Sequence, residues 1–169
     1  MRKNRLRELW AAGQAAVNGW VSVPSPYVAE VMSHQGWDGL TIDLQHGPID
    51  VPDAIPMLQA MSAGNAVPII RVPWNEPSVI MRCLDAGAYG IICPMINNRD
   101  DAERFVGACR YPPDGYRSNG AYRGTIYGGA DYLDHANEEI LTFAMIETRE
   151  GVANLQEIAE TPGLDAVYI

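Results

Sequence analysis

The sequence alternates short apolar runs with amphipathic stretches of about 10–15 residues, and this alternation constrains its fold more than any other feature. The apolar runs cover residues 17–23, 38–44, 67–72, 90–93, 141–146 and 164–169. Each run is short enough for one strand, and several are apolar throughout, which is typical of parallel strands buried on both faces. We therefore predict an α/β fold with a parallel sheet.

Capping signals mark the ends of the intervening helices. Ser25 stands where an N-cap is expected, Pro26 occupies the first helical position, and Gly87 fits a left-handed C-terminus. We expect helices over residues 5–12, 25–34, 51–62, 77–86, 98–110, 131–136 and 151–160, with Pro56 an awkward residue inside the third. Residues 111–129 are turn-rich, and a loop this long in a compact domain is usually functional or a lid.

A parallel sheet with a helix after most of its strands favours a TIM (β/α)8 barrel. Six βα-type units in 169 residues extrapolate to about eight in the ~250 residues of a complete barrel. The last apolar run, from Asp165 to Ile169, would leave an exposed strand edge if the protein ended there. We therefore expect residues 1–169 to form a single, partial barrel domain, truncated after its sixth strand. An open six-stranded sheet is the alternative.

Composition argues against several classes of partner. The net charge of −9 opposes attraction to nucleic acid or to an anionic membrane surface. No apolar run approaches the ~20 residues that cross a bilayer, and no signal-type segment follows the basic N-terminus. The cysteines are few and widely spaced, and we expect Cys83 and Cys93 to be small buried hydrophobes. A cytoplasmic location is expected.

Polar residues follow the apolar runs at the points where parallel strands would deliver them to one rim, which in a barrel carries the active site. His46 follows the second run, Arg71 ends the third, and Glu147 follows the fifth. His46 can serve as a general base if an acid such as Asp43 orients its ring. The alternative for His46 is an ordinary structural or surface histidine.

The other two rim residues have equally specific requirements. Burying a guanidinium is costly unless it is paired, so Arg71 needs an anionic or carbonyl-bearing partner, with a structural salt bridge as the alternative. Glu147 suits a hard cation, since Mg²⁺ and Mn²⁺ prefer carboxylate and water oxygens. One carboxylate does not make a metal site, so we expect a second acid beyond Ile169. Together these residues indicate metal-assisted enolate chemistry.

Several common kinds of enzyme are excluded. The sequence contains no GxGxxG turn, no Walker lysine loop and no GxSxG nucleophile elbow. Lys3 is the only lysine and lies on no expected strand, which excludes a Schiff-base aldolase for this portion. Arg117 and Arg123, in the turn-rich loop, are equally consistent with substrate binding and with surface exposure. Asp85, at a helix end, is either solvated or supports a histidine.

With these segments in place, the chain resembles a known family over almost its whole length. The shared motifs are GWDGLTIDLQHG (36–47), RVPWNEP (71–77), LDAGA (84–88), CPM (93–95), RYPPDG (110–115) and IETREG (146–151). Together they resemble the metal-dependent, class II 2-keto-acid aldolases of the HpcH/HpaI family, of the 4-hydroxy-2-oxoheptanedioate aldolase type. This family belongs to the pyruvate/phosphoenolpyruvate-binding barrel superfamily.

The resemblance implies a role for each rim residue. His46 would be the catalytic base, and Arg71 would hold and polarise the pyruvyl carbonyl of the substrate. Asp43 and Asp85 would orient His46 or its neighbourhood. Glu147 would be one ligand of a divalent metal ion (Mg²⁺, Mn²⁺ or Co²⁺).

Further expectations from the resemblance concern the rest of the site. Pro94 would contact the substrate, and the second metal ligand would be an aspartate in a Gly-Pro-x-Asp-Leu loop just past Ile169. Two positions depart from the family pattern. Gln45 stands where many relatives have Glu, and Met145 stands where some have Gln. Both departures bear on acceptor specificity and on tuning of the metal.

The implied activity is cleavage or formation of 4-hydroxy-2-keto acids, giving pyruvate and an aldehyde through a metal-stabilised pyruvate enolate. One alternative is an oxaloacetate decarboxylase or a macrophomate-synthase-like enzyme that forms carbon–carbon bonds from the same enolate. Another is a non-catalytic barrel that binds a ligand. The resemblance also implies a homo-oligomer, a hexamer or a trimer-based assembly.

Overall fold

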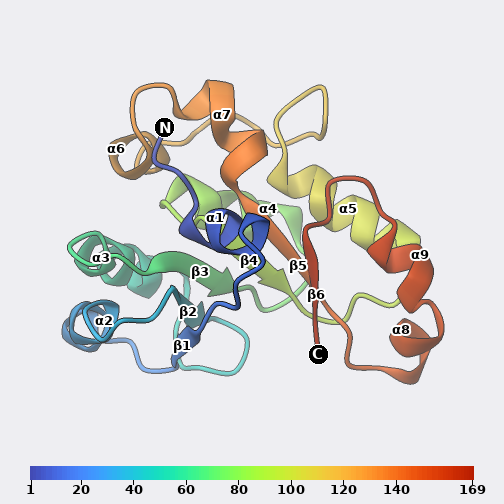
Figure 1. The fold of residues 1–169 in the computed structure, drawn as a ribbon, viewed down its shortest axis with the longest axis horizontal. Coiled ribbons are helices and arrows are strands. Elements are labelled where there is room, and N and C mark those ends of the chain that lie inside the picture. The colour runs from blue at the N-terminus through green and yellow to red at the C-terminus, as the bar shows by residue number, and fades with distance from the viewer.

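The computed structural model describes residues 1–169 and contains one six-stranded parallel sheet (Figure 1). Its strands are β1 (Asn18–Val21), β2 (Gly39–Asp43), β3 (Val67–Arg71), β4 (Gly90–Cys93), β5 (Leu141–Met145) and β6 (Ala166–Tyr168). They lie side by side in sequence order, each parallel to the next. An unbroken order is that of a barrel, whereas a doubly wound sheet reverses its order at a switch point. The predicted parallel α/β architecture is confirmed.

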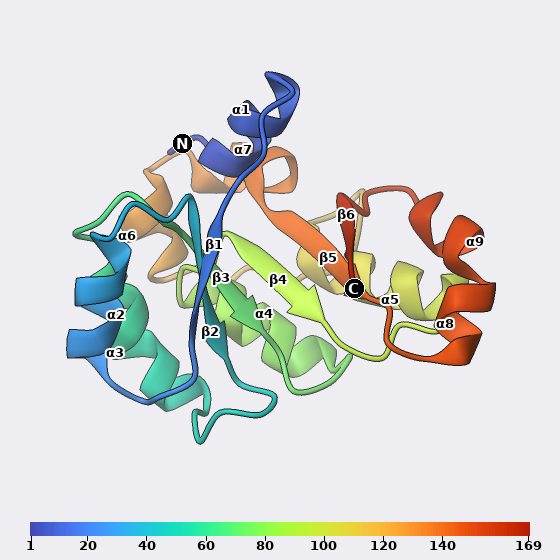
Figure 2. The same ribbon diagram turned by 60° about the horizontal axis from the view of Figure 1, so that its bottom comes forward.

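Nine helices accompany the sheet. They are α1 (Arg5–Ala11), α2 (Pro26–Ser33), α3 (Val51–Met61), α4 (Pro77–Asp85), α5 (Arg99–Cys109), α6 (Gly124–Gly128), α7 (Tyr132–Glu139), α8 (Arg149–Ala153) and α9 (Leu155–Ala159). Helices α2 to α5 pack one after another around the outside of the sheet (Figure 2). None of the helices is both long enough and apolar enough to span a membrane.

The helix boundaries follow the capping signals of the sequence. The Ser25 hydroxyl accepts a hydrogen bond from the Val28 N–H, and Pro26 is the first residue of α2. Gly87, just after α4, has a φ of +104°, a conformation that L side chains rarely adopt. Pro56 lies inside α3 without ending it. These ends therefore depend mainly on local chemistry.

Two segments differ from the sequence-based expectation. Residues 124–128 form the short helix α6 instead of a loop, although glycine disfavours helices. A Cβ on Gly128 would lie 2.6 Å from the Tyr132 ring, so the glycine is required by packing. The last expected helix is two short ones, α8 and α9, which meet at Asn154. The side chain of Asn154 donates to the Asn97 carbonyl at 2.8 Å and so ties the junction to a neighbouring loop.

The sheet curves so that its two edge strands approach each other. The rings of Trp20 on β1 and Tyr168 on β6 have centroids 6.0 Å apart. Helix α1 lies across the N-terminal ends of the strands, where its Trp10 packs edge-on against Phe143 of β5 at 6.0 Å. Helix α1 therefore covers the inner face of the sheet at the N-terminal ends of its strands.

All three cysteines are buried and unpaired, as expected for Cys83 and Cys93. Burial raises the pKa of Cys83 and that of Cys109 to about 12. These thiols are therefore protonated hydrophobes rather than nucleophiles.

Candidate active site

The site forms where β2, β3, β4 and β5 end at the same edge of the sheet. Asp43 and Arg71 are the last residues of β2 and β3 and are direct partners in the parallel register. Pro94 follows β4 directly and is buried, while Glu147 follows β5 by two residues and is exposed. The sheet thus brings four of the residues expected at the rim to one edge.

Asp43 and Arg71 form a bidentate ion pair beneath this rim. Arg71 Nε donates to Asp43 Oδ1 at 2.9 Å, and Arg71 Nη2 donates to Oδ2 at 2.6 Å. The two side chains are only 11% and 4% exposed. Arg71 Nη1 has no hydrogen-bond partner in the chain and is not sealed from solvent. The guanidinium is therefore held on one side and free to bind an oxygen on the other.

Trp20 completes the support of this pair. The Arg71 guanidinium lies 4.8 Å from the centroid of the Trp20 ring, which is cation–π distance. The indole Nε1–H donates to Asp43 Oδ2 at 3.3 Å. Trp20 was not expected from the sequence, because an aromatic residue in a strand is usually a core residue. The only feature that could have indicated this role is the position of Trp20, which pairs with Thr41, two residues before Asp43 on β2.

The Asp43 carboxylate is fully engaged. In addition to Arg71 and Trp20, it accepts hydrogen bonds at Oδ1 from the backbone N–H groups of Gln45 and His46, at 3.0 and 3.3 Å. Burial acts to raise the pKa of Asp43, but the Arg71 bond and the two backbone bonds outweigh it, so the pKa lies below its ordinary value. Asp43 is therefore an ionised anchor for Arg71 and not a proton carrier.

His46 lies in the loop after β2, with an exposed side chain. Its backbone N–H binds Asp43, but its ring makes no hydrogen bond within the chain. Asp43 thus fixes the loop rather than the ring, which differs from the orienting role expected for it. The turn also needs Gly47, because a Cβ there would lie 2.6 Å from the Asp43 carbonyl oxygen. The imidazole is free to meet a substrate at the rim.

Glu147 is held by the neighbouring loop. Its Oε1 accepts a hydrogen bond from the Met95 N–H at 3.0 Å, and its Oε2 has no partner in the chain. Met95 adopts a φ of 57°, in the left-handed region. Glu147 also borders an open hollow of about 470 Å³ that Ile146, Thr148, Arg149 and Val152 line with it. The carboxylate is therefore both anchored and accessible.

The donor set at this edge fits one protein ligand of a divalent cation. Glu147 offers a free carboxylate oxygen, the donor that Mg²⁺ and Mn²⁺ prefer, and Mg²⁺ is commonly held by one or two carboxylates together with water and substrate oxygens. Asp43 cannot be the second ligand, because Arg71 and Trp20 occupy its oxygens. The chain contains no cluster of three His, Cys, Asp or Glu residues that could hold a metal by itself.

Asp85 lies at the other end of the sheet and makes no contact with His46 within the chain. It ends α4, shortly before β4 begins, and its Oδ1 accepts a hydrogen bond from Arg117 Nη2 at 2.9 Å. Within one chain, Asp85 therefore does not reach the rim. Its partner Arg117 has no exposed side-chain surface and stacks on Tyr111 at 4.5 Å.

Arg123 is likewise a structural residue of that end. It is buried and donates to the carbonyls of Ala86 and Leu58 at 2.9 and 3.0 Å, at the C-termini of two helices. Burial lowers the pKa of Arg123. Neither Arg117 nor Arg123 is a surface residue or a rim residue, so both expectations for them are replaced by a role in holding residues 111–123 to the helices.

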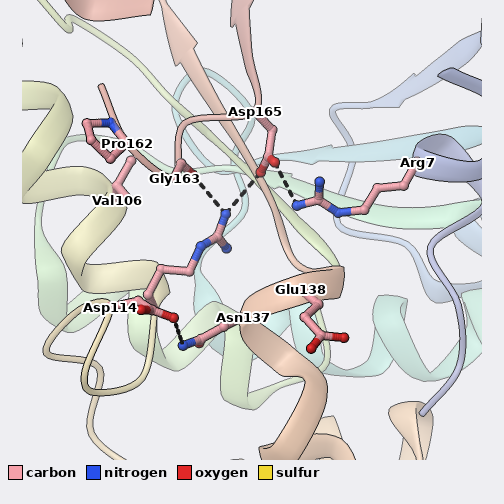
Figure 3. Close-up of a pocket in the computed structure, with 9 residues that line it drawn as sticks. Arg7, Val106, Asp114, Asn137, Glu138, Pro162, Gly163 and Asp165 are labelled. Carbon is pink, nitrogen blue, oxygen red and sulfur yellow. Dashed lines mark hydrogen bonds and ion pairs between the residues drawn. The ribbon is translucent and has the colours of Figure 1, made fainter. Parts of the chain in front are cut away.

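Figure 3 shows a more enclosed hollow of the same volume, about 470 Å³, that lies far from the rim. It surrounds the start of β5 and the turn before β6, at the edge opposite His46 and Glu147. Arg7 and Arg110 both bind Asp165, at 2.7 and 3.0 Å, and Asn137 binds Asp114 at 2.9 Å. Because these ion pairs occupy the charged groups named here and no residue expected at the rim lines the hollow, the rim is the better candidate for chemistry.

Comparison with known proteins agrees with this geometry. A family model described as HpcH/HpaI aldolase/citrate lyase matches residues 17–169. A hydroxypyruvate/pyruvate aldolase of Rhizorhabdus wittichii is 44% identical over 98% of the chain and 66% of its own length. A 5-keto-4-deoxy-D-glucarate aldolase of Escherichia coli is 35% identical over the same shares. The chain thus spans about two thirds of the length of the curated relatives it matches.

A solved structure gives the same result for the fold. The crystal structure of an HpcH/HpaI aldolase/citrate lyase family protein from Burkholderia cenocepacia superposes with a TM-score of 0.88 at 35% identity. The match covers 98% of the chain and 68% of that protein. The six-stranded parallel sheet therefore corresponds to part of a barrel of this kind, which confirms the predicted fold class. The chain belongs to the HpcH/HpaI aldolase/citrate lyase family.

Proposed function

We propose that the chain carries the keto-acid site of a class II aldolase, which cleaves 4-hydroxy-2-keto acids to pyruvate and an aldehyde. Membership of the family and the names of two relatives support an aldolase acting on keto acids. The observation that carries the proposal is Arg71, whose guanidinium is held by Asp43 while Nη1 has no partner in the chain. A fixed cation with free donors is what a developing enolate oxygen requires.

Arg71 would bind the ketone oxygen of the substrate. Asp43 and Trp20 hold its guanidinium before substrate arrives, so no reorganisation is needed when negative charge develops on that oxygen. Pro94, buried directly after β4, would contact the pyruvyl group by packing. The ion pair thus serves binding of the substrate and stabilisation of the enolate at once.

His46 would take the proton of the C4 hydroxyl. As that proton leaves, the C3–C4 bond breaks, the aldehyde carbonyl forms at C4, and the electron pair of the broken bond becomes the pyruvate enolate. Proton transfer by a positioned side chain contributes about 10²–10⁴-fold to a rate. Because the His46 ring has no partner in the chain, the bound substrate would complete its orientation.

Glu147 would be one ligand of a divalent cation such as Mg²⁺, Mn²⁺ or Co²⁺, together with an aspartate that we expect past Ile169. When bound, such a cation supplies Lewis-acid stabilisation of the substrate's carboxylate and ketone oxygens. The name of one relative, hydroxypyruvate/pyruvate aldolase, supports pyruvate or hydroxypyruvate as the nucleophilic partner. Assembly into a homo-oligomer stays a prediction.

The test is pyruvate release followed with a coupled lactate dehydrogenase assay. The protein that includes the aspartate expected past Ile169 should release pyruvate from a 4-hydroxy-2-keto acid, lose this activity on chelation, and regain it with Mg²⁺ or Mn²⁺. His46→Ala should lower kcat by about 10²-fold or more, since it removes the base, and leave the melting temperature unchanged because the ring is exposed. An unimpaired His46→Ala variant, or cleavage that survives complete chelation, would contradict the mechanism.

Two other functions are distinguished by the same assay. Faster turnover of oxaloacetate than of any hydroxy-keto acid would indicate a decarboxylase or a related enzyme that uses the same enolate. Pyruvate binding without any cleavage would indicate a binding module. Arg71→Lys distinguishes a loss of activity at the site from a loss of folding. Lysine keeps the positive charge beside Asp43 but loses the bidentate contact, so a folded variant without activity locates the defect in the site.

A further inference from the structure

The loops after β4 and β5 are joined by hydrogen bonds that converge beside Glu147. The Met95 N–H donates to Glu147 Oε1 at 3.0 Å, and the next residue, Ile96, donates its N–H to the Met145 carbonyl at 3.3 Å. These bonds link a loop from one strand to the carboxylate that follows the neighbouring strand. The position of Glu147 therefore depends on the conformation of residues 94–98.

Asn97 is the residue that joins the two loops. Its Nδ2 donates to the Met95 carbonyl at 3.1 Å, and its Oδ1 accepts a hydrogen bond from the Thr148 hydroxyl. Its carbonyl accepts from Asn154 Nδ2 at 2.8 Å, and its N–H donates to Asp101 Oδ2 at 3.1 Å. The Asn97 side chain thus holds Met95, two residues earlier in the first loop, and Thr148, the residue after Glu147 in the second.

This arrangement explains how Met95 keeps an unfavourable backbone conformation. A φ of 57° is uncommon for a residue with a side chain, and it persists only where the surroundings enforce it. The bond from Asn97 to the Met95 carbonyl and the bond from Met95 to Glu147 enforce it from both sides. Releasing Asn97 would let Met95 relax and turn its N–H away from the carboxylate.

We propose that Asn97 is a positioning residue that, through Met95 and Thr148, holds Glu147 with Oε1 occupied and Oε2 available to a divalent cation. The proposal rests on the proposed function, in which Glu147 is a metal ligand. Carboxylates that bind metals are themselves hydrogen-bonded, and loss of such an outer partner typically weakens metal affinity about 10–100-fold.

The experiment is a Mn²⁺ titration of the protein that includes the aspartate expected past Ile169, with free Mn²⁺ measured by electron paramagnetic resonance and no substrate present. Asn97→Leu removes both side-chain bonds at similar volume and should raise the Mn²⁺ dissociation constant about 10-fold or more. Thr148→Val, which loses the hydroxyl, should also weaken binding. Thr148→Ser keeps the hydroxyl and should bind as the parent chain does.

Two controls separate the possible failures. Asn75→Ala removes another asparagine near this edge, which binds the Asp101 carbonyl at 2.9 Å but does not touch Glu147, and it should leave Mn²⁺ affinity unchanged. If Glu147→Gln binds Mn²⁺ as tightly as the parent chain, Glu147 is not a ligand and the metal part of the proposed function fails. If Glu147→Gln weakens binding but Asn97→Leu and Thr148→Val do not, only the positioning role is overturned.

The positioning role of Asn97 can be tested even if one of the variants does not fold. If Asn97→Leu fails to fold, the Thr148→Val and Thr148→Ser pair decides, because the two differ in one hydroxyl bond to Asn97 and in the cap of α8. Equal Mn²⁺ affinity of these two folded variants would refute the proposal. Weaker binding by the valine variant alone would support it.

Discussion

Replacing Asp43 with alanine should destabilise the chain strongly, because it would leave Arg71 buried without its counter-ion. The Arg71 side chain is 11% exposed, and both of its bonds to Asp43 are short, at 2.9 and 2.6 Å. Removing one partner of a buried ion pair costs about 3–5 kcal/mol. Two charge-assisted hydrogen bonds at about 1.5–3 kcal/mol each give about 3–6 kcal/mol, which overlaps this range.

A second substitution that removes the Arg71 charge should largely restore the stability lost in Asp43→Ala. Asp43→Ala combined with Arg71→Met removes both buried charges, and replacing a buried pair with apolar groups is often close to neutral. The double variant should therefore be more stable than Asp43→Ala alone, with a large coupling energy between the two sites. It should release no pyruvate, since the cation that would bind the ketone oxygen is gone.

Urea unfolding of the parent chain, both single variants and the double variant measures this cycle. With a denaturant slope of about 2 kcal/mol per M, a loss of about 4 kcal/mol lowers the urea midpoint by about 2 M. Asp43→Ala within about 1 kcal/mol of the parent chain would refute the view that Asp43 is the anchor of Arg71. A double variant as unstable as Asp43→Ala would refute it as well.

The pKa of Asp43 lies below its ordinary value, so the folded chain should bind fewer protons than the unfolded chain below about pH 4. The contribution of Asp43 to the free energy of unfolding is fully present above that pH and is lost as the pH falls through its folded pKa. Urea midpoints measured from pH 3 to 7 should show this loss in the parent chain and not in Asp43→Asn. Asp85→Ala should lower the free energy of unfolding by about 3 kcal/mol, because buried Arg117 loses its partner at 2.9 Å. Pyruvate release per folded molecule tests the orienting role expected for Asp85: unchanged release would exclude Asp85 from the active site, and abolished release would support that role.

Much of the site could be predicted from the sequence because strand ends are local features. The apolar runs 38–44, 67–72 and 141–146 give strands that end within one or two residues of where they were expected. Parallel pairing then places Asp43, Arg71 and Glu147 at one edge whatever the details of packing. The helix starts at Ser25 and the end at Gly87 follow from capping and backbone preferences of single residues.

The partners of those residues were decided only by the tertiary structure. Asp43 binds a residue 28 positions away and Asp85 one 32 positions away, and the sequence gives no signal of which acid faces which arginine. The choice depends on which end of the sheet a helix terminus reaches and on how the turn-rich loop folds back over it. By itself the sequence determined the order of strands, the edge that carries the polar residues and the family. Which carboxylate anchors Arg71, which arginines are structural, and how Asn97 joins two loops required the packed fold, because such contacts form between segments that meet only after the sheet has curved.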